Sequence, residues 1–519
     1  MRHNLFAAVA GFGFGVASAY AQPVFEPRPA PEHQYTGGWE HFVGGGVAAF
    51  DCDSDLLPDL YAAGGETPAV LMRNRTEARG AQLRFVEETP DALSLTGVTG
   101  AYPLDVDGDA ILDLVILRVG ENQLLRGQGD CRFAPFDAAL GFQSGDRWTT
   151  AFSATWEAGQ ALPTLAFGNY VDRTDPDGPF EACDASMLYR PDGARYSAPA
   201  PLAPGFCTLS MLFSDWGRNG RADLRMSNDR HYYVRGGSEQ MWAMEPTPRL
   251  YTEAEGWQRQ QLWGMGIAAR DLTGDGLSEV FLTSMGDQIL QSLQGDGSRP
   301  EYINAPYARG TTAQRPYTGG DGRPSTGWQV SFGDVDNDGR DDVFIAKGNV
   351  DQMPGSAMDD PNNLLVQQGD GRFEEMGADA GIASMARGRG AALVDLNLDG
   401  QLDLVVVNRR APLELYENET ENAGSWLLLA PEQDGANRNA VGAFLEVRAG
   451  EKRWSREITV GGGHASGSAG FAHFGLGFAD RAEVRVIWPD GATSDWQAVA
   501  VNQVLTLARN GTDLSVAAR

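Results

Sequence analysis

Short runs of apolar residues recur along the chain, and polar loops rich in aspartate stand directly before or after them. Residues 47–50 (VAAF) and 330–333 (VSFG) precede such loops, and residues 114–117 (LVIL), 343–346 (VFIA) and 404–407 (LVVV) follow them. Apolar runs of this length, rich in β-branched residues and bounded by turn residues, predict buried β-strands. The pattern therefore predicts repeated strand–loop–strand units.

The polar loops carry oxygen-bearing side chains at alternate positions, which we number 1, 3, 5 and 9 within each loop. The clearest copies are residues 105–113 (DVDGDAILD) and 334–342 (DVDNDGRDD), and others begin at Asp51, Asp215, Asp271 and Asp395. With a backbone carbonyl at position 7, such side chains form a cage for a hard cation, and calcium accepts about six to eight oxygens in flexible geometry. We therefore predict up to six Ca²⁺ ions as cofactors.

Two other structures are compatible with aspartate-rich loops. An EF-hand needs a glutamate at position 12, but that position is apolar in the better copies, as at Ile116 and Ile345. An acidic turn without an ion would explain one copy, whereas six copies in register favour the cage. Loop 215–223 is the weakest, because Gly217 stands at position 3. The predicted metal ligands are Asp51, Asp53, Asp55, Leu57, Asp59, Asp105, Asp107, Asp109, Ile111, Asp113, Asp215, Asn219, Arg221, Asp223, Asp271, Thr273, Asp275, Leu277, Glu279, Asp334, Asp336, Asp338, Arg340, Asp342, Asp395, Asn397, Asp399, Gln401 and Asp403.

The spacing of the loops predicts the architecture. The first aspartates recur about every sixty residues, and the interval from Asp105 to Asp215 is about twice as long as the others. Strand–turn–aromatic hairpins recur at 124–133 and 364–373 and, inside the long interval, at 187–196. We expect a repeat there that lost its cage, with Asn169 at position 1. Such repeats bury their faces only against neighbours, so we predict an all-β fold with a seven-bladed β-propeller over residues 46–423.

Composition narrows the class of protein. A chain of 519 residues suits a propeller plus one further module. Its 65 glycines and 27 prolines fit many short strands joined by turns. The net charge of −29 would repel phosphates, so we expect no nucleic-acid partner. We also expect no transmembrane segment, because no stretch after the N-terminus is long and apolar enough.

The N-terminal residues predict export. Arg2 and His3 precede an apolar run over residues 5–17, and Ala19-Tyr20-Ala21 resembles a cleavage site, although cleavage after Ala19 also fits. We therefore predict a signal peptide over residues 1–21. Residues 22–45 are predicted to contain a proline-rich linker (23–32) and the entry strand of the propeller.

The cysteines agree with an exported protein. Four cysteines are enough for two disulfides, which form in oxidising compartments. Three pairings are possible, and we favour Cys183 with Cys207 and Cys52 with Cys131. The expected location is secreted, periplasmic or on the cell surface.

After Glu421 the aspartate loops stop and strand-like alternation continues. The segment contains NRN followed by VGA at 437–443, GGG at 461–463, HFGLG at 473–477 and WPDG at 488–491. It resembles the ASPIC/UnbV domain, and the preceding loops resemble FG-GAP/VCBS repeats, so the mature chain resembles the cartilage acidic protein family. The resemblance implies integrin-like calcium loops and a small C-terminal β-sandwich-like domain over residues 424–519. We expect its FGLG and WPDG turns to pack against its own sheet.

The sequence contains no convincing active site. His464 and Ser466 lie in a glycine-rich turn, but no acid is placed to orient the histidine. His473 fits a packed strand position, and residues 228–231 (NDRH) fit a solvated loop. Trp216 and Trp328 lie near loops, where they could stack on a sugar. We predict no enzyme, and no catalytic residues.

Two functions remain open on the sequence. The first is a calcium-stabilised binding or adhesion scaffold for an extracellular or envelope protein or glycan. The second is an exported hydrolase or lectin-like protein with a site on the propeller face or in its central channel. Acid and base residues converging from different repeats would favour the second, and the sequence shows none.

Overall fold

The structure is a computed structural model that describes residues 21–229, 235–317, 322–511 and 513–519. The predicted signal peptide lies almost entirely outside this range. The described chain is built from β-strands, with one short helix, α1 (Asp137–Leu140), and three 3₁₀ turns, η1 (Trp39–His41), η2 (Glu253–Glu255) and η3 (Tyr307–Arg309). The predicted all-β class is confirmed. Among the described residues, no helix is both long and apolar enough to cross a membrane.

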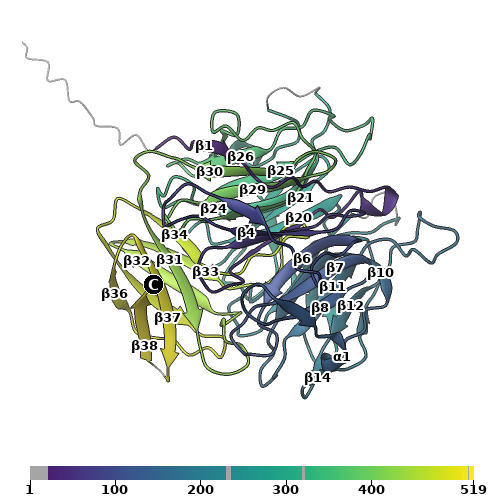
Figure 1. The fold of residues 1–519 in the computed structure, drawn as a ribbon, viewed down its shortest axis with the longest axis horizontal. Coiled ribbons are helices and arrows are strands. Elements are labelled where there is room, and N and C mark those ends of the chain that lie inside the picture. Colours follow the sequence, from purple (N-terminus) through teal and green to yellow (C-terminus); the bar gives the residue numbers. More distant parts are fainter. Residues whose placement is uncertain (1–20, 230–234, 318–321, 512) are drawn as a thin grey trace, which may run out of the picture.

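Residues 25–418 form successive antiparallel units of four strands (Figure 1). The first unit contains β2 (Val47–Phe50), β3 (Asp59–Ala62), β4 (Val70–Asn74) and β5 (Phe85–Glu87), and the second β6 (Val98–Leu104), β7 (Asp113–Glu121), β8 (Gln123–Gly127) and β9 (Phe133–Pro135). The third contains β10 (Asp146–Thr155), β11 (Thr164–Asn169), β12 (Ser186–Tyr189) and β15 (Ala200–Leu202), beside a small ribbon of β13 (Pro191–Asp192) and β14 (Arg195–Tyr196). Because β10 also pairs with the end of β7, the second and third units share one eight-stranded sheet.

The later units repeat this plan. The fourth contains β16 (Thr208–Ser214), β17 (Asp223–Asn228), β18 (Gln240–Ala243) and β19 (Arg249–Leu250), and the fifth β20 (Gly264–Arg270), β21 (Glu279–Ser284), β22 (Ile289–Leu293) and β23 (Tyr302–Asn304). The sixth contains β24 (Gly327–Gly333), β25 (Asp342–Lys347), β26 (Asn363–Gln367) and β27 (Phe373–Glu375). The seventh contains β28 (Gly388–Val394), β29 (Asp403–Asn408), β30 (Glu414–Asn418) and β1 (Phe25–Arg28).

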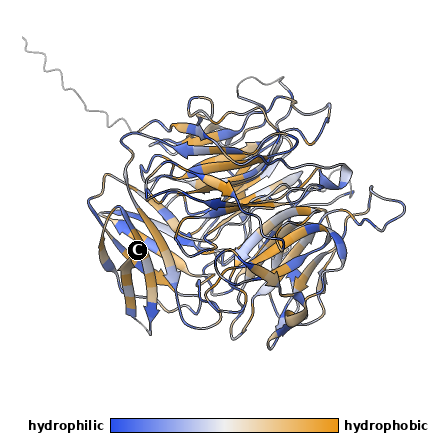
Figure 2. Cartoon of the chain, in the orientation of Figure 1, coloured by the Kyte–Doolittle hydropathy of each residue, from blue (hydrophilic) through white to orange (hydrophobic). Residues whose placement is uncertain are grey.

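The apolar runs are continuous because the strands are buried on both faces. In β25, Val343 and Ile345 pack in a core with the fifth unit, whereas Phe344 and Ala346 pack in a core with the seventh. Side chains alternate between the two faces of a strand, so every residue of such a run meets a neighbouring sheet. Figure 2 shows hydrophobic residues along the strands of these packed sheets. Each unit shares a core with the next in this way, and the first shares one with the seventh.

The predicted linker is partly wrong, because residues 25–28 form strand β1. It pairs antiparallel with β30, with Phe25 opposite Asn418. Pro27 is tolerated there because β1 is the edge strand of its sheet, where a missing N–H breaks no inner ladder. The N-terminal strand thus completes the last unit.

The third unit lies where the long interval predicted a repeat. Strands β11 and β12 pair, with Phe167 opposite Met187, as the hairpin pattern implied. The assignment of Asn169 to loop position 1 is wrong, because Asn169 ends β11. The segment that corresponds to an aspartate loop is residues 156–163, between β10 and β11, and Glu157 is its only carboxylate.

Residues 425–518 form two further four-stranded sheets, coloured yellow in Figure 1. One contains β31 (Ser425–Glu432), β34 (Ala472–Gly477), β37 (Gln503–Asn510) and β38 (Asp513–Ala518), and the other β32 (Phe444–Ala449), β33 (Lys452–Glu457), β35 (Arg481–Ile487) and β36 (Gln497–Ala500). Their inner faces share one apolar core that includes Trp488. This is the sandwich-like arrangement that the family resemblance implied.

One loop of this C-terminal region leaves its own sheets. Residues 459–469, here called the central segment, run between β33 and β34 and bond to the first strands of several units. Ala154, Leu212, Ile267, Ala101 and Ala49 each form a bridge with it. These residues come from β10, β16, β20, β6 and β2, so the central segment enters the space that the first strands enclose, where a cavity of about 260 Å³ lies beside it.

Candidate metal loops and the uncovered face

The six aspartate loops share one backbone geometry. In each, the position-1 aspartate accepts hydrogen bonds from backbone N–H groups further along the loop: Gly339 donates to Asp334 at 2.7 Å, and Ala110 donates to Asp105 at 2.9 Å. Positions 4 and 6 both have positive φ in all six loops. The residues at these positions are Ser54, Leu56, Gly108, Ala110, Arg218, Gly220, Gly274, Gly276, Asn337, Gly339, Leu398 and Gly400.

The acid at position 9 ties the loop to its sheet. Asp342 accepts from the N–H of Val335 at 3.0 Å and from the N–H of Gln367 on β26 at 2.8 Å. Asp113 does the same with Val106 and Gly127, both at 2.8 Å. Each of these carboxylates therefore fixes both the start of its loop and the neighbouring strand.

Three loops bring three carboxylates together. One oxygen from each member lies within 4.8 Å of the others in the groups Asp51/Asp53/Asp59, Asp105/Asp107/Asp113 and Asp334/Asp336/Asp342. In two of these loops the aspartate at position 3 has one buried oxygen without a hydrogen-bond partner. These atoms are Asp53 Oδ1 and Asp107 Oδ1. A buried carboxylate oxygen without a partner is costly, so the donor set fits a hard cation. In the other three loops the described carboxylates are not brought together as such triads.

The pKa values of several acids in these loops are raised, chiefly by burial, with repulsion between neighbouring carboxylates adding to the effect. Burial raises the pKa of Asp59, Asp113 and Glu279 to about 7, and that of Asp395 to about 8. Arginines lie over some carboxylates: Arg126 is 2.7 Å from Asp107 and 2.9 Å from Asp109. The loops thus hold more negative charge than their surroundings neutralise.

Loop 215–223 differs from the others. Its position-9 acid, Asp223, accepts from Arg221 at 2.9 Å, from the hydroxyl of Tyr251 at 2.6 Å and from the indole of Trp216 at 3.1 Å. Arg221 was predicted as a position-7 carbonyl ligand, and here its own side chain supplies a cation to the loop. With glycine at position 3 as well, this loop is the least suited to an ion.

The C-terminal sheets cover the loops. Trp454 donates to the carbonyl of Gly339 at 3.0 Å, His473 lies 3.0 Å from the carbonyl of Gly400, and Arg456 pairs with Asp341 at 2.9 Å. FGLG is not the expected turn, because these residues form strand β34; Phe474 and Leu476 pack in the core of the C-terminal sheets as expected, while Gly477 donates to the carbonyl of Asn337 at 2.8 Å. The glycines let the strand lie against the 334–342 loop.

The candidate residues for catalysis or sugar stacking are buried. His464 is fully buried, its Nε2 accepts from the N–H of Gly44 at 3.1 Å, and burial lowers its pKa to about 3. Trp328 packs on its ring at a centroid distance of 4.9 Å. Trp216 is buried as well, so neither tryptophan offers a surface for a sugar. Asn228 and Asp229 are also buried, contrary to the expected solvated loop, and residues 230–231 lie outside the described chain.

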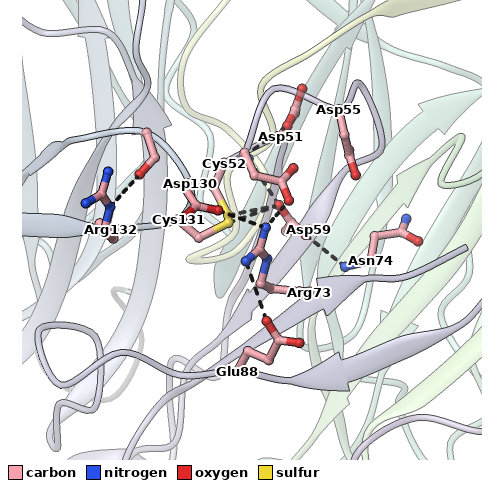
Figure 3. Close-up of a disulfide and its surroundings, with 12 residues drawn as sticks. Asp51, Cys52, Asp55, Asp59, Arg73, Asn74, Glu88, Asp130, Cys131 and Arg132 are labelled. Carbon is pink, nitrogen blue, oxygen red and sulfur yellow. Dashed lines mark hydrogen bonds and ion pairs between the residues drawn. A yellow bond between two sulfur atoms is a disulfide. The ribbon is translucent and has the colours of Figure 1, made fainter.

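Both disulfides join the cysteines that the sequence analysis paired. Cys52 and Cys131 lie with their Cα atoms 4.7 Å apart, and Cys183 and Cys207 4.9 Å apart. The first links the 51–59 loop to the β8–β9 turn of the next unit, with Asp59 and Arg73 beside it (Figure 3). It holds the first metal loop against its neighbour.

Comparisons with known proteins agree with the C-terminal assignment. The family model "ASPIC and UnbV" matches residues 433–513. Cartilage acidic protein 1 of Mus musculus is 28% identical over 177 residues, which is 32% of this chain and 26% of that protein, and the Xenopus tropicalis protein is 28% identical over 201 residues, or 36% and 29%. The resemblance to the cartilage acidic protein family is confirmed. The match spans less than a third of the length of these relatives.

Solved structures give weaker similarities. The BBS1N chain from a complex with ARL6DN gives a TM-score of 0.41 at 9% identity, covering 76% of this chain and 96% of that one. An Agrocybe aegerita lectin that recognises terminal N-acetylglucosamine gives 0.37 at 15% identity, covering 73% and 94%. These scores are low, and no conclusion is drawn from either likeness.

Proposed function

We propose that this chain is an exported, calcium-binding seven-bladed β-propeller that acts as a binding or adhesion scaffold for an extracellular or envelope protein or glycan, without catalysis. The cyclic order of shared cores supports the propeller, because each four-stranded unit packs on the next and the first packs on the seventh. Pairing of β1 with β30 further supports a ring closed by the two ends of the repeat region.

The observation that carries the calcium proposal is the convergence of three carboxylates in each of three loops, two of which contain a buried oxygen without a partner. Asp105, Asp107, Asp109 and Asp113, with the carbonyl of Ile111, would hold one ion. Calcium would neutralise carboxylates that otherwise repel each other. The acids of loops 51–59, 334–342, 271–279 and 395–403 would act alike, and loop 215–223 least well.

The absence of catalysis is supported by what surrounds the candidate histidine. The ring nitrogens of His464 face the backbone N–H of Gly44 and the carbonyl of Met265, and Arg389 is the charged group that most affects its pKa. Among the described residues, no carboxylate is paired with its ring, and the central segment occupies part of the channel where a hydrolytic site was the alternative. Export is supported by the two disulfides, which persist in oxidising compartments.

Native mass spectrometry after dialysis against calcium tests the metal proposal. We expect several bound calcium ions, with one fewer in Asp107→Asn and no change in Asp370→Asn, an exposed carboxylate outside the loops. Partner capture from native envelope or medium, with and without a chelator, tests the scaffold. Bound calcium in none of the samples would refute the cage, and turnover in a hydrolase panel would refute the non-catalytic assignment.

A further inference from the structure

A pocket of about 420 Å³ lies at the end of the repeat region away from the metal loops. The metal loops precede β21, β25 and β29, whereas pocket residues such as Met285, Val350 and Arg409 follow the same strands. In a ring of such four-stranded units, the starts and the ends of these strands lie on opposite faces of the ring. The C-terminal sheets that cover the loops therefore leave this face uncovered.

Most of the pocket wall is apolar. Trp39, Phe42, Met265, Met285 and Met353 line it. Trp39 keeps 51% of its surface exposed, while it packs edge-on against the buried Trp148 at a centroid distance of 5.9 Å. Ligand pockets of this size class are commonly apolar, with a few polar groups that set orientation. An exposed indole held in place at the rim suits an aromatic or flat apolar body.

Positive charge is in excess at one side of the pocket. Arg387, Arg409 and Arg410 share a single carboxylate oxygen, Asp351 Oδ1, at 3.3, 3.9 and 3.0 Å. Directly behind them, Arg389 is fully buried and donates to backbone carbonyls, including that of Phe42 at 3.0 Å. Within the described ranges, no carboxylate lies at ion-pair distance from Arg389. Four guanidinium groups thus lie near two carboxylates of the lining, Asp351 and Asp229, in a chain whose net charge is −29.

Arg409 offers a donor that the protein does not use. Its side chain is only 1% exposed and its Nη2 donates to the carbonyl of Gly37 at 3.1 Å, but its Nε has no hydrogen-bond partner. The second carboxylate of the lining, Asp229, is engaged by the hydroxyl of Tyr170 at 2.6 Å. A buried guanidinium with an unmet donor is costly unless a charged acceptor reaches it. Arg409 therefore places buried positive charge behind this side of the pocket, and Arg410, whose side chain is 46% exposed, is the arginine that a ligand can contact.

We propose that this pocket binds a small molecule that has an apolar, preferably aromatic, body and one carboxylate. The body lies between Trp39 and the methionines, and the carboxylate accepts charge-assisted hydrogen bonds from Arg410, while Arg409 behind it adds positive charge. This site goes beyond the scaffold function. It needs neither calcium nor a macromolecular partner, so a test of this site is independent of the tests of the proposed function.

Isothermal titration calorimetry of the full chain with three matched probes tests the site. Hydrocinnamate carries the carboxylate, hydrocinnamyl alcohol has the same body without charge, and phenylpropylamine has the opposite charge. Because hydrogen bonds to charged groups are stronger than neutral ones, we expect the acid to bind about tenfold to a hundredfold more tightly than the alcohol. We expect the amine to bind least.

Three variants separate this site from nonspecific binding. Arg410→Gln, whose side chain is partly exposed, and Arg409→Gln should each weaken hydrocinnamate about tenfold and leave the alcohol unchanged. Asp351→Asn removes the shared carboxylate and should strengthen acid binding. Arg372→Gln, an exposed arginine on the β26–β27 turn, serves as the control and should change nothing.

The proposal is overturned if the acid and the alcohol bind equally, or if none of the three probes binds. It is also overturned if Asp351→Asn weakens the acid while Arg410→Gln does not. Circular dichroism of each variant shows whether it is folded. If Arg409→Gln is unfolded, the opposite effects of Arg410→Gln and Asp351→Asn decide the outcome.

Discussion

Replacing Gly100 with alanine should disrupt the contact between the repeat region and the central segment. A Cβ atom at Gly100 would lie 2.1 Å from the carbonyl oxygen of Ala465 and 2.7 Å from its Cβ. Such separations are far shorter than van der Waals contact, and the nearest obstacle is backbone, which cannot rotate away. The φ angle of Gly100 is not left-handed, so the effect comes from packing rather than from backbone strain.

The size of the effect follows from what the central segment would lose. If it shifts locally, overpacking of this kind costs about 1–3 kcal/mol. If it leaves the channel, six backbone hydrogen bonds are lost, each worth about 1 kcal/mol net. These bonds join Ala154 to Val460, Gly462 to Met211, Gly463 to Ile267, Gly467 to Ala101, and Ala49 to both Gly467 and Ala469. We therefore expect the free energy of unfolding to fall by about 1–6 kcal/mol.

Urea unfolding and limited elastase digestion measure the two consequences. Gly100→Ala should unfold at lower urea and be cut within residues 459–469, while the native chain is protected there. Gly369→Ala is the matched control, because no atom lies within 4 Å of its added Cβ and its φ is not left-handed. If Gly100→Ala unfolds at the same urea concentration as Gly369→Ala and elastase does not cut it within residues 459–469, the central segment is not packed as described.

Three further outcomes are expected. Excess chelator should lower the melting temperature, because an ion bound only to the native state adds about 2.7 kcal/mol of stability per site when its free concentration is a hundred times Kd. Asp107→Asn should reduce this chelator-dependent shift. Equal melting temperatures with and without chelator would contradict the prediction. Ala110→Gly should raise the free energy of unfolding by about 1 kcal/mol, because Ala110 is exposed and has φ of +70°, as urea titration can show. His464 has a folded pKa of about 3, below its ordinary value, so only the unfolded state binds its proton between the two values. The contribution of His464 to stability should therefore fall by about 1.4 kcal/mol per pH unit below about pH 6. The difference between the pH profiles of the native chain and of His464→Gln, with Arg389 still beside residue 464, should show this slope if the variant folds.

The sequence was sufficient for the local units and insufficient for their contacts. Alternate aspartates followed by apolar runs predicted the loops and strands, because ligand spacing and two-sided burial both leave a periodic signal. Four of the six loops have glycine at position 6, a residue type that favours the positive φ found there. Position 4 was missed, since Ser54, Arg218 and Leu398 adopt positive φ without any residue type that favours it. There the loop geometry determines the backbone conformation.

Longer-range features had no periodic signal. The GGG run at 461–463 was noted only as part of a motif, and nothing local indicated that it enters the centre of the repeat region. Arg221 was predicted as a metal ligand through its backbone carbonyl, whereas its guanidinium group donates a hydrogen bond to Asp223 across the loop. The pocket at Arg409 joins residues from several units, so spacing along the chain could not reveal it. Each of these depends on which elements become neighbours after folding.

The pairing of β1 with β30 has a consequence for the order of folding. Val24 and Thr420, which share a hydrogen bond at this junction, are separated by 396 positions in the chain. Strand β1 is made first during synthesis, yet its partner is among the last elements of the repeat region to emerge. Until then, both strands have unpaired edges, which invite association with other chains. Closure is thus a late event, and a nascent chain needs protection from aggregation until the whole repeat region has emerged.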